Sequence, residues 1–158
     1  MLRIFRKLQD LRFSDLAELY CDSRMNDEDC LASEQDFYFY LKSCFFTDRK
    51  AFYAVWEDKG SYVAALRMEP YKNGLLLAGL QTQAGKEGKG YATILVQQTL
   101  AYLADGNTAF VYSHVEKSNK ASVRVHEKCG FFVFSDSATF IDGSFSSNAR
   151  TYLYKYEN

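Results

Sequence analysis

The sequence predicts a mixed α+β domain, in which a central twisted mixed sheet of about seven strands is flanked by about four helices on both faces. Two observations support this fold class. Helix-like and strand-like patterns alternate early in the chain, and three strand-like segments separated by turns form its middle. The chain also has a single proline, Pro70, and no linker, repeat or low-complexity stretch, so we expect one domain over residues 1–158.

The first third of the chain predicts one strand and two helices. Residues 2–8 alternate apolar with charged side chains, as a half-exposed strand does. Ser14 and Ser33 are each expected to cap a helix N-terminus, because a serine hydroxyl can accept a hydrogen bond from an unpaired backbone N–H group. The apolar residues of these two helices recur at helical spacing: Leu16, Leu19, Tyr20, Phe37, Leu41 and Phe45.

The remaining elements follow from turn signals and from apolar periodicity. Three strands are expected at residues 51–57, 61–69 and 74–82, separated by the turn sequences DKG and PYKNG. Further along, we expect a helix that begins after a glycine-rich loop and ends near Leu103, followed by a strand at 109–115. A second helix is expected at 119–129, closed by Gly130. The last two strands are expected at 131–134 and 151–157, joined by a hairpin through Asp142 and Gly143.

Bulk composition argues against several classes of partner. The net charge of −1 gives no field that would recruit nucleic acid or an anionic membrane. The longest aliphatic run, residues 75–78, is far too short to span a bilayer, and the basic N-terminus lacks the apolar core of a signal peptide, so we expect a cytoplasmic protein. The four cysteines do not stand at metal-ligand spacing and there are two histidines, so no metal is expected.

The glycine-rich loop at residues 85–90 is the strongest functional signal. Bare backbone N–H groups at the start of a helix favour an anion, most often a phosphate group. A Walker-type loop would need Ser or Thr after Gly88-Lys89, where Gly90 stands. A dinucleotide fingerprint would need a third glycine where Thr93 stands. Neither motif fits this loop.

A third pattern fits. Residues Glu87–Ala92 resemble the signature Arg/Gln-x-x-Gly-x-Gly/Ala of the GNAT family of N-acetyltransferases, and residues 119–134 resemble that family's segment N-x-x-S-x-x-x-y-e-k-x-G-F. The second segment matches at Asn119, Ser122, Glu127, Lys128, Gly130 and Phe131. The chain departs from the family pattern at Glu87, where Arg or Gln is usual, at Ala84, which is often Pro, and at His126, which is often Tyr.

The resemblance implies the GNAT fold and an acetyl-coenzyme A (acetyl-CoA) site. It implies that the backbone of Thr82, Gln83 and Ala84 pairs with the pantetheine arm as an added strand would. It assigns the pyrophosphate to the loop and the helix start: Glu87, Gly88, Lys89, Gly90, Tyr91, Ala92 and Thr93. Lys89 could equally be a solvated surface lysine. Asn119 is expected to cap its helix, to contact the cofactor arm, or to do both.

The catalytic residues are less well defined by the resemblance. His126 or Ser122 is expected to protonate or orient the leaving thiol, although a histidine at this position could also simply pack against the sheet. For the general base the candidates are Glu69, His114 and Glu116, and an amine deprotonated in a desolvated pocket would need no base.

The resemblance also implies that the segment between the first two helices, residues 21–37, walls the acceptor site, and its acidic composition reads as a loop. The segment carries six carboxylates against one arginine, which would attract a primary amine such as a small cationic amine or a peptide N-terminus. We expect Asp27 and Glu28, with the aromatic Tyr38 close behind, to bind this acceptor. The alternative reading is a solvated acidic loop.

The sequence therefore predicts an acetyl-CoA-dependent N-acetyltransferase that joins donor and amine in a ternary complex. Two alternatives stay open: a catalytically silent acyl-CoA-binding regulatory domain, and a plain interaction domain with a vestigial loop. Exposed strand edges and the aromatic C-terminal segment would also allow a homodimer.

Overall fold

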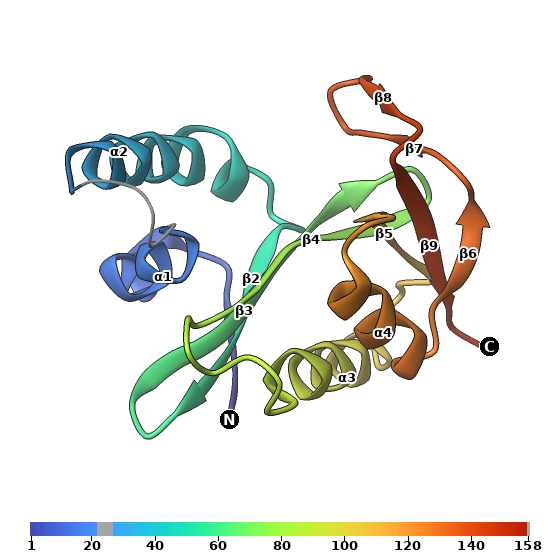
Figure 1. The fold of residues 1–158 in the computed structure, drawn as a ribbon, viewed down its shortest axis with the longest axis horizontal. Helices are drawn as coiled ribbons and strands as arrows, with labels where there is room; N and C mark the ends of the chain where they lie inside the picture. The colour runs from blue at the N-terminus through green and yellow to red at the C-terminus, as the bar shows by residue number, and fades with distance from the viewer. Residues whose placement is uncertain (22–26, 158) are drawn as a thin grey trace.

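A seven-stranded mixed sheet with strand order β1-β2-β3-β4-β5-β9-β6 forms the centre of the molecule (Figure 1). The computed structural model describes residues 1–21 and 27–157; at positions 27 and 29–31 it describes the backbone alone. The strands are β1 (Leu2–Phe5), β2 (Phe52–Asp58), β3 (Ser61–Tyr71), β4 (Gly74–Thr82), β5 (Phe110–Glu116), β6 (Phe132–Ser135), β7 (Ala138–Thr139), β8 (Phe145–Ser146) and β9 (Ala149–Lys155). The helices are α1 (Phe13–Tyr20), α2 (Asp27–Ser43), α3 (Tyr91–Leu103) and α4 (Lys120–Lys128), with short 3-10 turns at Leu8–Asp10 and Phe45–Thr47.

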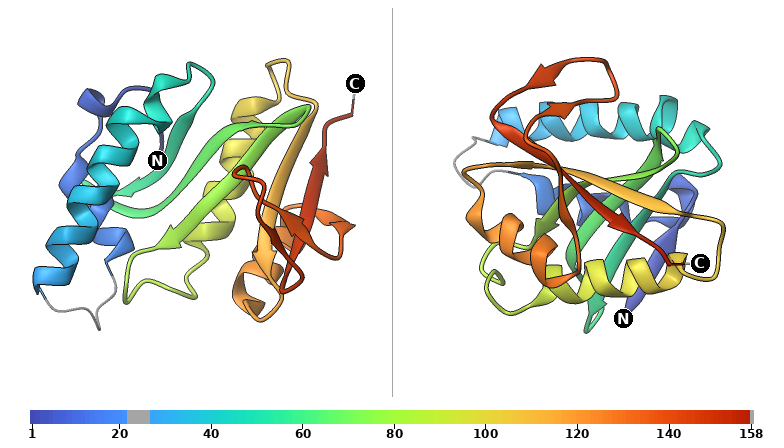
Figure 2. Two further views of the ribbon diagram at one scale, coloured as in Figure 1. Left: turned by 90° about the horizontal axis from the view of Figure 1, so that it is seen from above. Right: turned by 90° about the vertical axis from the view of Figure 1, so that its right-hand side faces the viewer.

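The helices form a layer on each face of the sheet. Helices α1 and α2 cover one face of its N-terminal half, and α3 and α4 lie on the opposite face (Figures 1 and 2). This arrangement confirms the predicted mixed α+β fold.

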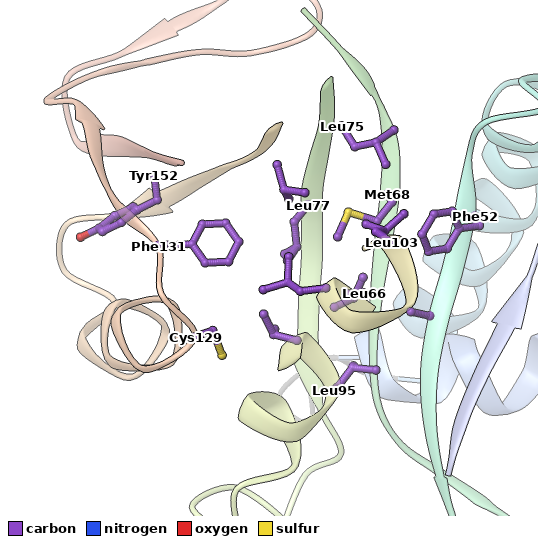
Figure 3. Close-up of a cluster of buried hydrophobic side chains, with 14 of the residues drawn as sticks. Phe52, Leu66, Met68, Leu75, Leu77, Leu95, Leu103, Cys129, Phe131 and Tyr152 are labelled. Atoms are coloured by element: carbon purple, nitrogen blue, oxygen red, sulfur yellow. The ribbon is translucent and has the colours of Figure 1, made fainter. Parts of the chain in front are cut away.

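Each layer buries its own apolar cluster. On the α3 side, Leu66 and Leu77 of the sheet pack with Leu95 of α3 and with Phe131, which follows α4 (Figure 3). On the α1 and α2 side, Leu16 and Leu41 pack against the strand residues of β2 and β3. Full burial of such side chains contributes roughly 1.5–3 kcal/mol each, so both helix layers are firmly attached to the sheet.

The starts of α1 and α2 differ from the sequence prediction. Ser14 and Ser33 lie inside these helices, so the prediction that they are N-caps is wrong. Helix α2 begins at Asp27, so residues 27–33 are helical, although the sequence predicted that the helix would start only after Ser33. The physical reason lies in the composition. The acidic residues at positions 27–29 suit the positive end of a helix dipole, and no glycine or proline interrupts the chain before Ser43.

Strand β4 contains a bulge. Ala65 pairs with Gln81 and Arg67 pairs with Ala78, so two steps along β3 correspond to three along β4. The extra residue falls at Gly79 and Leu80, and Gly79 has a φ of +62°, in the left-handed region that glycine tolerates.

Strands β4 and β5 then separate. They are the parallel pair of the sheet, and in the described chain they are paired at Leu75–Leu77 against Val111–Ser113. Beyond Leu77 the bulged end of β4 runs on to Thr82 without a β5 partner. This leaves a length of strand backbone open on one edge, next to the start of α3.

The C-terminal segment supplies the last two strands at one edge of the sheet. Strands β6 and β9 are antiparallel, as expected, and the short β7–β8 hairpin that extends from them carries the turn at Asp142 and Gly143. At the β6 edge Phe132, Val133 and Phe134 are each about half exposed, without a charged neighbour in the strand. The opposite edge strand, β1, carries Arg3. A homodimer stays a prediction, and β6 is the edge better suited to it.

In the described part of the chain, none of the helices has the length and apolar character needed to cross a bilayer.

Candidate active site at the divergence of strands β4 and β5

Two cavities meet at the β4 bulge from opposite sides. One, of about 430 Å³, lies between the end of β4, the glycine-rich loop and α4, and Leu80 belongs to its lining. The other, of about 610 Å³, lies between β3, β4, the end of α2 and the β7–β8 hairpin, and Gly79 belongs to its lining. Consecutive residues of one strand thus face different cavities. We call the first the loop cleft and the second the hairpin cavity.

The loop cleft is built on backbone rather than on side chains. Gly88 and Gly90 have φ values of +76° and +86°, which an L-residue adopts only with strain. A Cβ atom at either glycine would meet no described protein atom within 4 Å, so protein packing does not demand these glycines. Gly90 also occupies the N-cap of α3, where no described side chain caps the helix. The N–H groups of the first turn of α3 are therefore available to an anion.

Charge in the loop cleft is predominantly positive. Lys86, Arg124 and Lys128 line it, against one carboxylate, Glu87. Glu87 folds back so that its Oε2 accepts a hydrogen bond from the Gly85 backbone N–H at 2.8 Å. The carboxylate that stands in place of the family's Arg or Gln thus closes the turn of the loop, and the surrounding cations offset its charge.

Most of the residues predicted to hold the cofactor converge on this cleft. Its lining includes Thr82, Glu87, Gly88, Gly90, Tyr91, Ala92, Thr93 and Asn119. Gln83, Ala84 and Lys89 are not part of the described lining. The backbone N–H of Gln83 instead donates to the Val63 carbonyl at 2.8 Å, which continues the pairing with β3.

Sequence reasoning missed Arg124 and Lys128 in the loop cleft. They are four residues apart on α4 and therefore share a helix face. This spacing of two cations was the sequence signal that could have predicted their place in the cleft.

Helix α4 contributes two further predicted residues. The Asn119 side chain accepts a hydrogen bond from the Ser122 backbone N–H at 3.1 Å, so Asn119 is a true N-cap as well as a lining residue. Ser122 lines the cleft too, with its hydroxyl 3.4 Å from Nδ1 of His126.

His126 itself is 1% exposed, and the described linings of the two cavities do not include it. Its Nδ1 lies 2.7 Å from the Ser122 carbonyl oxygen, and its Nε2 lies 2.8 Å from the Ser113 hydroxyl. The carbonyl can only accept, so Nδ1 donates and Nε2 accepts from Ser113. Burial lowers the pKa of His126, which keeps the ring neutral near pH 7. This arrangement is that of a packed, fully bonded histidine.

The hairpin cavity is lined by ionisable side chains from widely separated segments. Arg67 and Glu69 come from β3, His114 from β5, Asp48 from the segment after α2, and Asp142 from the β7–β8 hairpin. These side chains give three carboxylates against one guanidinium. Burial lowers the pKa of His114, so the imidazole adds no charge at neutral pH. The cavity therefore carries net negative charge.

Glu69 has the chemistry of a base. Burial raises its pKa, the nearby Arg67 charge opposes that shift, and Asp48 adds to it. A carboxylate with a raised pKa binds a proton more readily than an exposed glutamate does.

The residues predicted to bind the acceptor do not gather at this cavity. Asp27 lies outside the described side chains, and Glu28 is exposed on α2. Tyr38 packs edge-on against Phe13, with ring centroids 5.1 Å apart, and lines a different hollow. Tyr40, two residues further along α2, lines the hairpin cavity instead, because residues two apart project from nearly opposite sides of a helix.

The bulge between the cavities is tied to α1. The Tyr20 hydroxyl donates to the Gly79 carbonyl oxygen at 2.6 Å. This bond satisfies one backbone group that the bulge removes from ladder pairing, and it fixes the orientation of the peptide between Gly79 and Leu80.

The described residues contain no group of three or more His, Cys, Asp or Glu side chains arranged to hold a metal ion.

Comparisons with known proteins bear on this geometry. The family model described as the acetyltransferase (GNAT) family matches residues 13–131. Among curated protein sequences none matches the chain.

Several solved structures are similar over nearly their full length. A chimera of the Vibrio cholerae spermidine N-acetyltransferase and hSSAT is 21% identical, with a TM-score of 0.71 over 98% of this chain and 95% of that one. The PaiA N-acetyltransferase of Thermoplasma acidophilum, solved with coenzyme A, is 12% identical, with a TM-score of 0.71 over 99% of each chain. The PseH N-acetyltransferase of Campylobacter jejuni, solved with acetyl-CoA, is 15% identical, with a TM-score of 0.68 over 99% of each chain. At these identities the likeness shows a shared fold.

Proposed function

The chain belongs to the acetyltransferase (GNAT) family, and from that premise we propose that it transfers the acetyl group of acetyl-CoA to a primary amine in a ternary complex. The acceptor is a small cationic amine or a peptide N-terminus. The observation that carries the proposal is the meeting of a positively charged cleft and a negatively charged cavity at the bulged end of β4, which has no partner on its β5 side.

The loop cleft suits the donor. Its glycine backbone, the α3 N-terminus and the cations of α4 would hold the pyrophosphate, since an unpaired N–H cluster and positive charge both favour a dianion. The open edge of β4 through Thr82 would pair with the amide groups of the pantetheine arm. The thioester would then lie at the bulge, next to the hairpin cavity.

The hairpin cavity suits the amine. Its carboxylates would attract the ammonium form, and Glu69, directly or through a water, would take the proton that the nitrogen must lose. The nitrogen lone pair then attacks the thioester carbonyl carbon, while backbone N–H groups of β4 stabilise the developing oxyanion. The carbon–sulfur bond breaks, the acetyl group stays on nitrogen, and coenzyme A leaves as a thiolate that takes up a proton.

Ser122 is the better placed of the two candidate groups for the thiol. Its hydroxyl lies in the loop cleft, where it would donate a hydrogen bond to the sulfur, whereas His126 is buried behind it. We assign His126 the role of positioning Ser122, through its contacts with the Ser122 hydroxyl and carbonyl groups.

A covalent route through Cys129 is disfavoured. Burial raises the pKa of Cys129 to about 11, so the thiol stays protonated near pH 7, and its Sγ lies 3.6 Å from the Thr93 carbonyl oxygen in the packing between α3 and α4.

A silent acyl-CoA-binding domain is the second candidate, because a buried histidine stands where the family often has a tyrosine. Such a domain would bind acyl-CoA in the same loop cleft but would not transfer the acetyl group to an amine.

Thermal unfolding with acetyl-CoA tests the donor site. Ligand at about a hundredfold its Kd should add roughly 2.7 kcal/mol to the free energy of unfolding, while adenosine diphosphate and nicotinamide dinucleotide at equal concentration should add less. Release of free thiol with a panel of amines then separates the two candidates: turnover supports the transferase, and binding without turnover supports the silent domain. Absence of any acetyl-CoA shift would refute both.

A further inference from the structure

Arg67 carries a buried donor, Nε, without a hydrogen bond among the described residues. It projects from β3 into the hairpin cavity. Its ion-pair contact within that part of the chain is with Glu69, where Nε and Oε1 are 3.9 Å apart, too far for a hydrogen bond. The nearby ring of Tyr40, with its centroid 5.8 Å from the guanidinium carbon, offers a weak cation–π contact.

A buried N–H donor of this kind is expected to have a hydrogen-bond acceptor. A guanidinium has five N–H donors and cannot lose its proton, and buried donors in native proteins are nearly always bonded. The buried hydroxyl of Tyr53 likewise has no hydrogen-bond partner among the described residues. Tyr53 and Arg67 interact electrostatically, yet the Tyr53 hydroxyl and Nε of Arg67 both remain without a hydrogen bond among the described residues. An anionic oxygen group of a ligand would satisfy the guanidinium bidentately.

The position of Arg67 specifies where that oxygen group would lie. A Cβ atom built on Gly79 would stand 2.7 Å from Nη1 of Arg67, so the guanidinium rests directly against the bulge of β4. The same bulge separates the two cavities, and it is where the attacking nitrogen must meet the thioester. A group bound by Arg67 therefore lies beside the reacting amine.

The charges around Arg67 define the rest of the ligand. Asp48, Glu69 and Asp142 line the same cavity and favour an ammonium group. A simple polyamine would satisfy the carboxylates but would place positive charge against the guanidinium. A ligand with both signs of charge satisfies both sets of side chains.

We propose that the acceptor carries an anionic oxygen group one or two carbons from its reactive amine, as an α-amino acid does, and that Arg67 binds this group. The inference rests on the proposed acetyl transfer and names the class of acceptor for the same site. The shared chemistry is an anionic oxygen pair, which a carboxylate or a phosphate ester could supply.

Matched pairs of acceptors test the proposal by thiol release from acetyl-CoA and by calorimetric binding to the protein saturated with coenzyme A. Lysine with cadaverine, ornithine with putrescine, and arginine with agmatine each differ by one carboxylate. Phosphoethanolamine with ethanolamine tests a phosphate. We expect the anionic member of at least one pair to be favoured tenfold or more, and the carboxylate and phosphate arms identify the source of the anion.

Two variants link the preference to Arg67. Arg67→Gln should abolish the preference within the favoured pair while the acetyl-CoA thermal shift is retained, and Arg67→Lys should restore part of it. Arg49→Gln is the matched control, because it removes a positive charge from an exposed residue outside the described lining of the cavity.

The proposal is overturned if the anion-free amine binds or reacts as well in every pair, if no anionic member binds, or if Arg67→Gln keeps the preference. Each of these outcomes leaves acetyl-CoA binding intact as support for the proposed function, whereas loss of acetyl-CoA binding by the unaltered protein would refute the function itself.

Discussion

The loop cleft and the hairpin cavity adjoin the same bulge but are built by opposite means. The loop cleft uses backbone N–H groups, positive-φ glycines and a helix terminus, and its loop and helix start come from one stretch of chain, residues 86–93. The hairpin cavity uses charged and titratable side chains that four separate segments bring together: β3, β5, the segment after α2 and the β7–β8 hairpin. The first arrangement suits a ligand that all related enzymes share, and the second suits a ligand that differs from one related enzyme to another. Substitutions should therefore act differently on the two sides.

The largest effect is expected at Gly90. Gly90→Val places a β-branched side chain at a φ of +86° and projects methyl groups toward the proposed position of the pyrophosphate, so acetyl-CoA affinity should fall more than a hundredfold. The strain itself costs about 1–2 kcal/mol of stability. Gly60→Val is the control, because Gly60 has a φ of +80° and open space around its Cβ position but lies in the β2–β3 turn. Equal loss of the acetyl-CoA thermal shift in both variants would mean that strain, not the cleft, is responsible.

The next largest effect is expected on the other side of the bulge. Glu69→Gln should lower kcat/KM for the amine roughly a hundredfold, in the range typical of a lost general base, with little change in acetyl-CoA affinity. Burial raises the pKa of Glu69, and the base must be deprotonated to act. Activity of the unaltered protein should therefore fall with decreasing pH at a higher pH than an exposed glutamate would give, and Glu69→Gln should remove that limb.

Glu116→Gln is the control for Glu69, since Glu116 is exposed at the end of β5. An unchanged pH–rate profile in Glu69→Gln would show that the amine enters already deprotonated.

A smaller effect is expected when positive charge is removed from the loop cleft. The double substitution Arg124→Gln and Lys128→Gln should raise the Kd of acetyl-CoA about tenfold, equivalent to about 1.4 kcal/mol. Both side chains are exposed at the rim of the cleft, so the loss should shrink at high salt. The KM of the amine acceptor should stay constant. A salt-independent loss would indicate a packing role for these residues.

The smallest effect is expected from Tyr20→Phe. It removes the hydrogen bond to the Gly79 carbonyl, which is worth about 1 kcal/mol, and should lower kcat about fivefold through a less fixed bulge. Tyr38→Phe is its control, because Tyr38 lies on α2 and lines a different hollow. If the two variants are equally active, the bulge holds its shape without α1.

The sequence predicted the loop cleft well because that cleft is local. A glycine run followed by a helix and an Asn-capped helix can be recognised from short stretches, and Thr82, Gly88, Gly90 and Asn119 do line the cleft. The hairpin cavity could not be predicted in the same way. Asp48, Arg67 and Asp142 are far apart along the chain, and only the register of β3 with β4 and the position of the β7–β8 hairpin bring them together.

Two other expectations show what a local sequence pattern cannot predict. The acidic segment reads as a loop from its charge, yet without a glycine or proline it continues as helix. His126 shares a helix face with Ser122, but its Nε2 finds a partner in Ser113 on β5, and that contact draws the ring into the core. Such long-range contacts leave no trace in a local pattern.

The bulge at Gly79 and Leu80 also has a consequence for how this enzyme could be changed by selection. Because adjacent residues of this strand line different cavities, a mutation there should alter recognition of the proposed donor and acceptor together. Substitutions that allow a new amine should therefore accumulate in α2, in the segment that follows it and in the β7–β8 hairpin, because residues there line the hairpin cavity and not the loop cleft. In a mutational scan under selection for a new acceptor, Gly79 should stay invariant while positions 40, 48 and 142 diversify.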